Sequence, residues 1–349
     1  MTAPVKERPA GLWHPALYYA DRADYLAGVV GFVREGLERG EPVLVAVPEP
    51  NLGAVSDALT AAERAAVQLV DMRRAGRNPG RIIGGVLSAF VAEHPGRRVR
   101  IVGEPIWPGR SDDEYPACAE HEALINLALH DAPASVLCPY DTTGLDNGRI
   151  QDAARTHPVL IEGGRRWHSL DYADPAAVAA TFDRPLPPAP SDADIQVVGG
   201  PVGPAQARRF VHDVAAQAGM SPSRIAALRS VVQELVINTI VHAGGRGLLT
   251  VWVTDEHLVC QIEDPGFLPD VLAGRRPAAP SDVGHGLRLV HDLADLVRVH
   301  RRPGGTTIRV HLAFGTDAGQ AATARSATEE TVEVAPPART ADQASFAGC

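Results

Sequence analysis

The sequence predicts an α/β protein with two different domains, and two observations support this prediction. In the first half, short apolar segments that fit buried strands alternate with helical segments, which is the order of a doubly wound, mostly parallel sheet. In the second half, two long helical segments precede strands of alternating apolar pattern, which fits helices packed on one face of a mixed sheet. A length of 349 residues agrees with about two domains.

Changes in composition divide the chain into four parts. Residues 183–192 are rich in proline and are expected to form an extended linker. From residue 315 to residue 349 the chain is rich in Ala, Thr, Glu and Pro without periodicity, which is typical of a disordered tail. The folded parts are therefore predicted to span residues 10–182 and 193–314.

Each predicted strand is a short apolar run, and each predicted helix repeats apolar residues every three or four positions. In the first domain we expect strands at residues 42–47, 67–72, 99–103 and 134–141, and helices at 24–39, 81–94 and 113–129. In the second domain we expect helices at 204–218, 223–243 and from 286 onwards, and strands at 195–198, 248–255, 257–264, 296–300 and 306–312.

Composition excludes several classes of function. Lys6 is the only lysine, so a phosphate-binding loop of the G-x-x-x-x-G-K-[ST] type has no lysine to complete it. A net charge of -9 argues against a nucleic-acid partner. The four cysteines form no C-x-x-C pair, which argues against a zinc ribbon and a secreted disulfide scaffold. Because no apolar run has the length of a signal peptide or a membrane span, we expect a cytoplasmic protein without a membrane partner.

One predicted helix of the second domain carries three polar side chains at a spacing of four. Glu234, Asn238 and His242 therefore project from one face of this helix. The amide oxygen of Asn238 can bind a hard cation such as Mg²⁺ together with phosphate oxygens. The carboxylate of Glu234, one turn earlier, can take a proton from an attacking hydroxyl or water. Taken alone, Glu234 and Asn238 also fit a polar helix edge.

Three further motifs follow this helix in order. Asp264 ends a strand, where it can accept a hydrogen bond from an adenine amino group, and Gly266 follows it. Gly284 and Gly286 stand at the start of the next helix, where glycine lets phosphates approach backbone N–H groups. Thr306 stands at the start of the last strand. Each motif alone fits a turn or a helix start, whereas the ordered set fits a nucleotide site.

The ordered set resembles the ATP-binding fold of gyrase, Hsp90, histidine kinases and MutL, known as the GHKL or Bergerat fold. Within it, residues 193–314 resemble the anti-sigma serine kinases of the RsbW and SpoIIAB type. The resemblance is carried by QELVINTIVHAG, EDPGF, GHGLRLV and GGTTIRVHL. The resemblance implies ATP and Mg²⁺ as cofactors, with Glu234 as general base and Asn238 as the Mg²⁺ ligand. It also implies that Asp264, supported by Thr306, contacts the adenine. Gly284 and Gly286 would lie beside the triphosphate, and His242 and Gly266 would lie in the same site.

Two features depart from those kinases. Their D-x-G-x-G motif is reduced to a single glycine, Gly266. Asp282 stands where an arginine would meet the γ-phosphate, and this leaves Arg275, Arg276 or Arg288 as substitutes. The sequence therefore supports ATP binding better than it supports phosphoryl transfer.

The first domain carries polar residues near strand ends and on the helix between them. His14, Glu104, Glu122 and Cys138 form a candidate sensory pocket, and the same residues also fit structural roles at loops and core edges. A metal site made of His14, Cys138 and a carboxylate is a further interpretation, although no spacing typical of ligand pairs supports it.

Residues 12–165 resemble the MEDS sensory domain known from the dichloromethane regulator and from actinobacterial regulators. The carrying stretches are HPALYYADRADYLAGVVGFVREGLERGEPVLVAVP, GEPIWPGR, EHEALINLAL and CPYDTTGL. The resemblance implies a sensor of small hydrocarbon-like compounds whose fold has lost its phosphate loop, in agreement with the missing lysine.

Together the two resemblances point to the RsbA family of anti-sigma regulatory proteins. They imply a cytoplasmic signalling regulator that binds ATP, sequesters a sigma factor, and phosphorylates an anti-anti-sigma (STAS) protein on serine or threonine. The first domain would control this activity through a small-molecule ligand, and a homodimer is compatible with the arrangement. The alternative is a non-catalytic switch that binds ATP and a partner.

Overall fold

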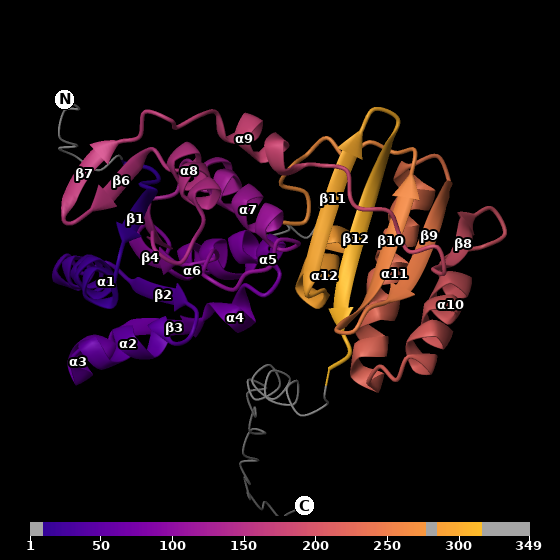
Figure 1. The fold of residues 1–349 in the computed structure, drawn as a ribbon, viewed down its shortest axis with the longest axis horizontal. Coiled ribbons are helices and arrows are strands. Elements are labelled where there is room, and N and C mark those ends of the chain that lie inside the picture. Colours follow the sequence, from indigo (N-terminus) through magenta and orange to yellow (C-terminus); the bar gives the residue numbers. More distant parts are fainter. Residues whose placement is uncertain (1–9, 277–284, 316–349) are drawn as a thin grey trace, which may run out of the picture. The chain divides into compact units, whose positions relative to one another are not determined.

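Two separate sheets organise the chain (Figure 1). The computed structural model describes residues 10–276 and 285–315. The first half forms a seven-stranded sheet and the second half a five-stranded sheet. This confirms the predicted fold class. Gly284, Asp282 and the tail predicted to be disordered, apart from Gly315, lie outside the described residues.

The seven-stranded sheet is doubly wound, with strand order β3-β2-β4-β5-β1-β6-β7. All neighbouring strands are parallel except the last pair, β6 and β7. The strands are β1 (Pro15–Tyr19), β2 (Val43–Val47), β3 (Val67–Asp71), β4 (Val99–Gly103), β5 (Ala134–Asp141), β6 (Val159–Glu162) and β7 (Arg165–His168).

Helices cover both faces of this sheet, because residues along each strand alternate between the faces. Val43 and Val45 of β2 pack in one apolar cluster with α1, whereas Leu44 and Ala46 pack in another with α7. The helices are α1 (Arg22–Glu38), α2 (Asn51–Ala58), α3 (Ala61–Ala65), α4 (Met72–Ala75), α5 (Pro79–Ile82), α6 (Ser88–Glu93), α7 (Tyr115–Ala128), α8 (Asn147–Thr156) and α9 (Pro175–Phe182).

Strands β1, β6 and β7 and helices α2, α3, α4, α8 and α9 were not predicted from the sequence. β1 is a five-residue strand, and β6 and β7 form a short antiparallel edge whose last strand is mostly exposed. Of these three strands, only β7 is mostly exposed and lacks the apolar run that identifies a buried strand, whereas β1 and β6 are buried strands that the sequence analysis did not single out. The helix predicted at 81–94 is interrupted by a π-helical turn, Ile83–Leu87, which contains two glycines.

The five-stranded sheet has the order β11-β12-β10-β9-β8, and every strand pair in the described residues is antiparallel. The sequence predicted a mixed sheet here. Two consecutive helices join β8 to β9 and return the chain in the opposite direction, so these two strands are antiparallel. The strands are β8 (Asp194–Gly199), β9 (Arg246–Val253), β10 (His257–Asp264), β11 (Leu296–Arg302) and β12 (Gly305–Ala313).

Three helices pack on one face of the second sheet: α10 (Pro204–Gln217), α11 (Pro222–His242) and α12 (His285–Leu293) (Figure 1). By length and composition, α11 is the one described helix that could cross a membrane. Its apolar face, which includes Val232 and Leu235, is buried in the core beneath the sheet. Its composition is therefore accounted for by a core helix whose opposite face is polar.

Candidate functional site

The polar face of α11 carries the three residues that the sequence placed together. Glu234 and Asn238 are partly buried and His242 is exposed, whereas Leu235 and Val236 between them are buried in the core. The spacing of four keeps the polar side chains on one side of the helix while apolar neighbours fix its rotation.

The end of β10 holds Asp264 in a fixed orientation. The Thr239 hydroxyl on α11 donates to Asp264 Oδ2 at 2.8 Å, and the backbone N–H of Gly266 donates to Oδ1 at 3.0 Å. Each carboxylate oxygen keeps a lone pair for another donor. Thr306 lies opposite Asp264 in the strand register, but its hydroxyl donates to the Gly266 carbonyl at 2.8 Å. Thr306 therefore contacts the loop after Asp264, and Thr239 contacts the carboxylate.

Sequence reasoning missed Thr239. The residue is completely buried, so it lies off the polar stripe formed by Glu234, Asn238 and His242. A threonine directly after the predicted metal ligand was the available signal, and only the packing of α11 against β10 shows its partner.

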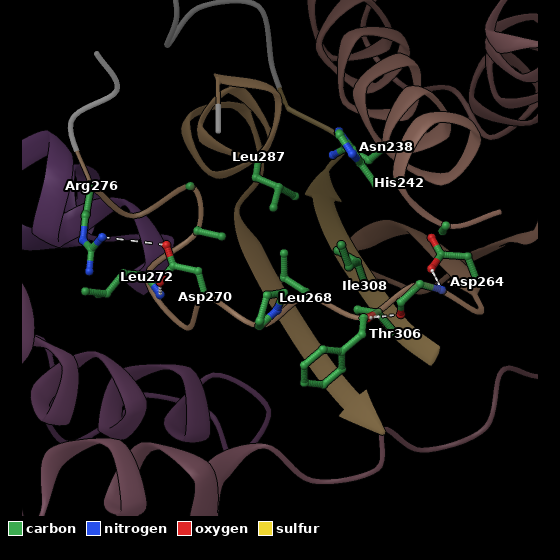
Figure 2. A pocket seen from close by; sticks show the side chains of 16 residues that line it. Asn238, His242, Asp264, Leu268, Asp270, Leu272, Arg276, Leu287, Thr306 and Ile308 are labelled. Carbon is green, nitrogen blue, oxygen red and sulfur yellow. Dashed lines mark hydrogen bonds and ion pairs between the residues drawn. The ribbon is translucent and has the colours of Figure 1, made fainter. Parts of the chain in front are cut away.

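A cavity of about 650 Å³ lies beside this face (Figure 2). Such a volume is within the usual range of small-molecule sites. Of the predicted residues, Asn238, His242, Asp264, Gly266 and Thr306 line it. Much of the remaining wall is apolar and includes Phe267, Leu268, Leu272, Leu287 and Ile308. The cavity thus combines an apolar wall with a few convergent polar groups.

Glu234 lies next to the cavity lining, where the first turn of α12 approaches α11. A Cβ atom added at Gly286 would lie 2.7 Å from Glu234 Oε2 and 3.7 Å from Asn238 Oδ1. A side chain at position 286 would therefore displace the carboxylate. The close approach gathers Glu234, Asn238 and the beginning of a helix, where backbone N–H groups favour anions.

These features fit a magnesium nucleotide. In the described part of the chain, the Asn238 side chain has no hydrogen-bond partner, which leaves its amide oxygen available to a cation. Asp264 presents free acceptor capacity on a carboxylate that the protein already orients. Gly286 has no side chain, so the first turn of α12 can lie against Glu234 and Asn238, next to the helix start that a phosphate could approach.

The three arginines that could meet a γ-phosphate differ in their surroundings. Arg275 is buried and forms an ion pair with Glu120 of α7. Arg288 donates to Asp292 at 2.9 Å within α12. Arg276 alone of the three lines the cavity, where it lies 3.8 Å from Asp270 (Figure 2).

The chain from Leu268 to Arg276, which we call the 268–276 segment, forms one wall of the cavity and also contacts the first domain. Leu272 packs in the apolar cluster of that domain and is only 2% exposed. Arg275 reaches Glu120 on α7, as described above. A wall of the candidate nucleotide site is therefore bound to a helix of the first domain.

A second link between the domains runs through α12. The side-chain amide of Asn78 donates to the backbone carbonyl of His291 at 2.8 Å, and both residues are buried. The helix that begins at the candidate phosphate position is thus also held by the first domain.

The four residues proposed as a sensory pocket fall into two places. Glu104 lines a cavity of about 380 Å³ at the carboxyl ends of the parallel strands, where ligands of such sheets bind. Burial raises the pKa of Glu104 to about 8, although hydrogen bonds from Asn51 and Tyr25 partly offset the effect. Asn51 donates at 3.0 Å and Tyr25 at 3.1 Å.

His14, Glu122 and Cys138 lie elsewhere, in the interior of the same domain. They meet a fourth residue, His157, which sequence reasoning missed. His157 follows the last turn of α8, and its distance along the chain from the other three gave no motif. All four residues of this group are buried and none of them lines the Glu104 cavity, so the group is a closed centre distinct from that cavity.

Comparison with known families identifies both folds. Residues 203–312 match the family model of the histidine kinase-like ATPase domain, a fold that implies nucleotide binding. Residues 13–158 match the MEDS family, described as methanogen/methylotroph, DcmR sensory domain. The chain therefore consists of a MEDS sensory domain followed by a histidine kinase-like ATPase domain.

Two solved structures are similar to this chain. The RsbU and RsbW domains of Rv1364c from Mycobacterium tuberculosis share 17% identity at a TM-score of 0.27, with 36% of this chain and 33% of that chain covered. Histidine kinase AdeS of Acinetobacter baumannii shares 14% identity at a TM-score of 0.22, with 35% and 68% covered. The chain thus spans about 33% of the length of the first structure. No curated protein matches the sequence.

Proposed function

We propose that this chain is a cytoplasmic signalling regulator of the anti-sigma type, whose ATPase domain binds ATP with Mg²⁺ under control of the sensory domain. The observation that carries the proposal is the cavity that gathers Asn238, Asp264 and Thr306 from three separate elements beside the start of α12. The partners are a sigma factor and an anti-anti-sigma protein, and a homodimer is compatible with this role.

Each residue has a specific part in the proposal. Asp264 accepts a hydrogen bond from the adenine amino group, while Thr239 and Gly266 hold its carboxylate in place. Asn238 supplies an amide oxygen to Mg²⁺, which neutralises phosphate charge when bound. Glu234, next to Gly286, is positioned to take a proton from a serine or threonine hydroxyl. His242 and Gly266 line the same cavity, and Gly284 is assigned to the phosphate side by its place in the sequence.

Control by the first domain rests on the 268–276 segment. The ion pair between Arg275 and Glu120 joins a wall of the nucleotide cavity to α7. A small molecule in the Glu104 cavity would act on the same sheet and helices that position Glu120. The proposed signal therefore travels from the first domain to the cavity wall through packed elements.

A second candidate function, a switch that binds ATP without transferring phosphate, is favoured by the arginines. Arg275 is held by Glu120 and Arg288 by Asp292, which leaves Arg276 as the cation of the three at the cavity. Phosphoryl transfer depends on positive charge around the γ-phosphate. An ATPase domain with few such charges suits a role in which bound nucleotide holds a conformation for a partner.

Calorimetric titration of the full chain with ATP, with and without Mg²⁺, tests nucleotide binding. We expect Asn238→Ala to remove the Mg²⁺-dependent part of the affinity, because it deletes the proposed cation ligand. Asn147→Ala, an exposed asparagine in the first domain, is the matched control and should bind as wild type does. Unchanged Mg²⁺-ATP affinity in Asn238→Ala would refute the site.

Transfer of the γ-phosphate to candidate anti-anti-sigma proteins separates the two candidate functions. If Glu234 is a general base, Glu234→Gln should lower transfer by about 10²–10⁴ while ATP affinity changes little. If wild type binds ATP and a sigma factor but transfers no phosphate to any of these proteins, the non-catalytic switch is the correct description.

A further inference from the structure

The closed centre of the first domain is formed by four side chains from four different elements. His14 precedes β1, Glu122 lies on α7, Cys138 on β5, and His157 follows α8. None of the four is more than 1% exposed. One ligand-type atom from each residue lies within 4.8 Å of every other. Four chemically reactive groups thus converge on one point that solvent does not reach.

The outer nitrogens of both histidines face acceptors, which fixes where the ring protons are. His14 Nδ1 lies 3.1 Å from Asn126 Oδ1, and the amide nitrogen of Asn126 is itself occupied by the Thr156 carbonyl at 2.8 Å. His157 Nδ1 lies 2.9 Å from the Ala153 carbonyl and 2.9 Å from Thr156 Oγ1, whose own proton goes to the Asp152 carbonyl at 3.0 Å. Since a carbonyl oxygen can only accept, both Nδ1 atoms carry the proton in the neutral rings.

The two Nε2 atoms therefore present lone pairs to the centre. Glu122 Oε2 lies 3.0 Å from His157 Nε2 and 3.3 Å from His14 Nε2, and His14 Nε2 lies 3.4 Å from Cys138 Sγ. Glu122 Oε2 is thus at ion-pair distance from both Nε2 atoms, but with the ring protons on Nδ1 it receives no N–H from either, and within the described residues Glu122 Oε1 has no hydrogen-bond partner. Only the Cys138 thiol brings a proton, so acceptors outnumber donors in a buried space where an unpaired polar group is costly.

A transition metal ion satisfies all four groups at once. Zinc in proteins takes four ligands in a tetrahedron, with bonds of about 2.0 Å to nitrogen and oxygen and about 2.3 Å to sulfur. The edges of such a tetrahedron are about 3.3–3.7 Å long, close to the separations of 3.0, 3.3 and 3.4 Å observed here. Charge also balances, because one carboxylate and one thiolate neutralise Zn²⁺ between two neutral imidazoles.

We propose that His14, Glu122, Cys138 and His157 form a structural Zn²⁺ site. On binding, the Cys138 sulfur forms a bond to zinc and releases its proton to solvent, with no change of oxidation state. The carbonyl and amide groups that hold the two Nδ1–H atoms act as the second layer that orients ligand histidines. Because all four positions are filled by protein and the centre is closed, the ion stabilises the fold and leaves no open position for catalysis.

Metal analysis of the full chain tests this proposal. The protein is refolded with zinc, dialysed against a weak chelator, and its zinc content measured by mass spectrometry, with one ion per chain expected. Reloading with Co²⁺ in place of zinc should give a thiolate-to-cobalt charge-transfer band, because a cysteine is among the ligands. A wild-type chain that retains no zinc would overturn the proposal, and the four side chains would then be joined by hydrogen bonds only.

Two cysteine variants assign the site without depending on one fragile mutant. The triple variant Cys118→Ala, Cys260→Ala and Cys349→Ala leaves Cys138 as the one thiol and should keep both the zinc and the cobalt band. Cys118 is the matched control, since it is completely buried on α7 but outside the centre. Cys138→Ala should lose the band. Loss of the band in the triple variant would instead show that the metal binds elsewhere, and would overturn the assignment.

Discussion

The candidate nucleotide site around Asp264 and the closed centre around Glu122 differ in how far the protein itself supplies partners for their carboxylates. The candidate nucleotide site is an open cavity whose carboxylate, Asp264, is already held by two hydrogen bonds and has capacity left for a ligand. The centre around Glu122 is closed, and its carboxylate faces two histidine Nε2 atoms that bring no proton when both rings are protonated on Nδ1. An open site can be left empty at little cost, whereas a closed one depends on its occupant for the stability of the fold.

The two centres should differ most in how strongly the loss of their glutamate lowers the stability of the fold. Glu122→Ala should lower the free energy of unfolding by about 3–5 kcal/mol, because it removes one member of a buried charged group and leaves the others uncompensated. Glu234→Ala, also a glutamate in mid-helix but beside the open cavity, should change it by at most about 1 kcal/mol. Urea denaturation measures both. Equal losses in the two variants would break the distinction between closed and open centres.

A third carboxyl group, Glu104, adds a pH test within the first domain. Its pKa is raised from 4.5 to about 8 by burial, so the folded state keeps a proton that the unfolded state has lost. Stability should therefore fall as the pH rises from about 4.5 to about 8, by an amount on the order of 4 kcal/mol, and level off above that.

Glu104→Gln should remove this fall, because the amide does not ionise and the Tyr25 hydroxyl can turn to accept from it. Denaturation series at several pH values compare the two proteins. A wild-type stability that is constant over this pH range would show that Glu104 is ionised in the folded state.

At the open site, substitutions should change the affinity for ATP and not the stability of the fold. Asp264→Asn should weaken ATP binding about tenfold to a hundredfold, since a charge-assisted hydrogen bond to the adenine is lost. Asp270→Asn removes the same charge from another side chain that lines the cavity, and should have a much smaller effect. If both variants weaken ATP equally, the role of Asp264 is general electrostatics and not contact with the base.

The smallest expected effect concerns the residue that orients Asp264. Thr239→Val removes the hydroxyl that donates to Oδ2 but keeps the buried shape, and should weaken ATP binding about fivefold. Thr306→Val removes a bond to the Gly266 carbonyl and should weaken it less. Calorimetry on both variants ranks the two threonines, and a larger effect at Thr306 would contradict the geometry.

The sequence predicted the open site better than the closed one for a physical reason. Helical periodicity places Glu234, Asn238 and His242 on one face, and Asp264 and Thr306 stand at strand ends. Local sequence patterns are therefore enough to identify these residues as candidates. The partner of Asp264, Thr239, was missed because its role depends on how α11 packs against β10.

The closed centre depends entirely on tertiary structure. His14 is separated by more than a hundred residues from two other members that it contacts, Glu122 and Cys138. No periodicity links residues that far apart, which is why Glu104 was grouped with them and His157 was not. The fold class was predictable because alternating strand and helix patterns are local, whereas the antiparallel pairing of the second sheet joins strands that are far apart in the sequence.

One helix, α7, carries both Glu120, which holds Arg275 of the 268–276 segment, and Glu122, which faces the closed centre two residues later. Thermodynamic linkage gives this arrangement a consequence that acts in both directions. Whatever factor a ligand of the first domain imposes on nucleotide affinity through α7, the nucleotide imposes the same factor on that ligand. In such an arrangement the ligand of the first domain changes the affinity for nucleotide, and the nucleotide concentration in turn changes the apparent affinity of the first domain for its ligand.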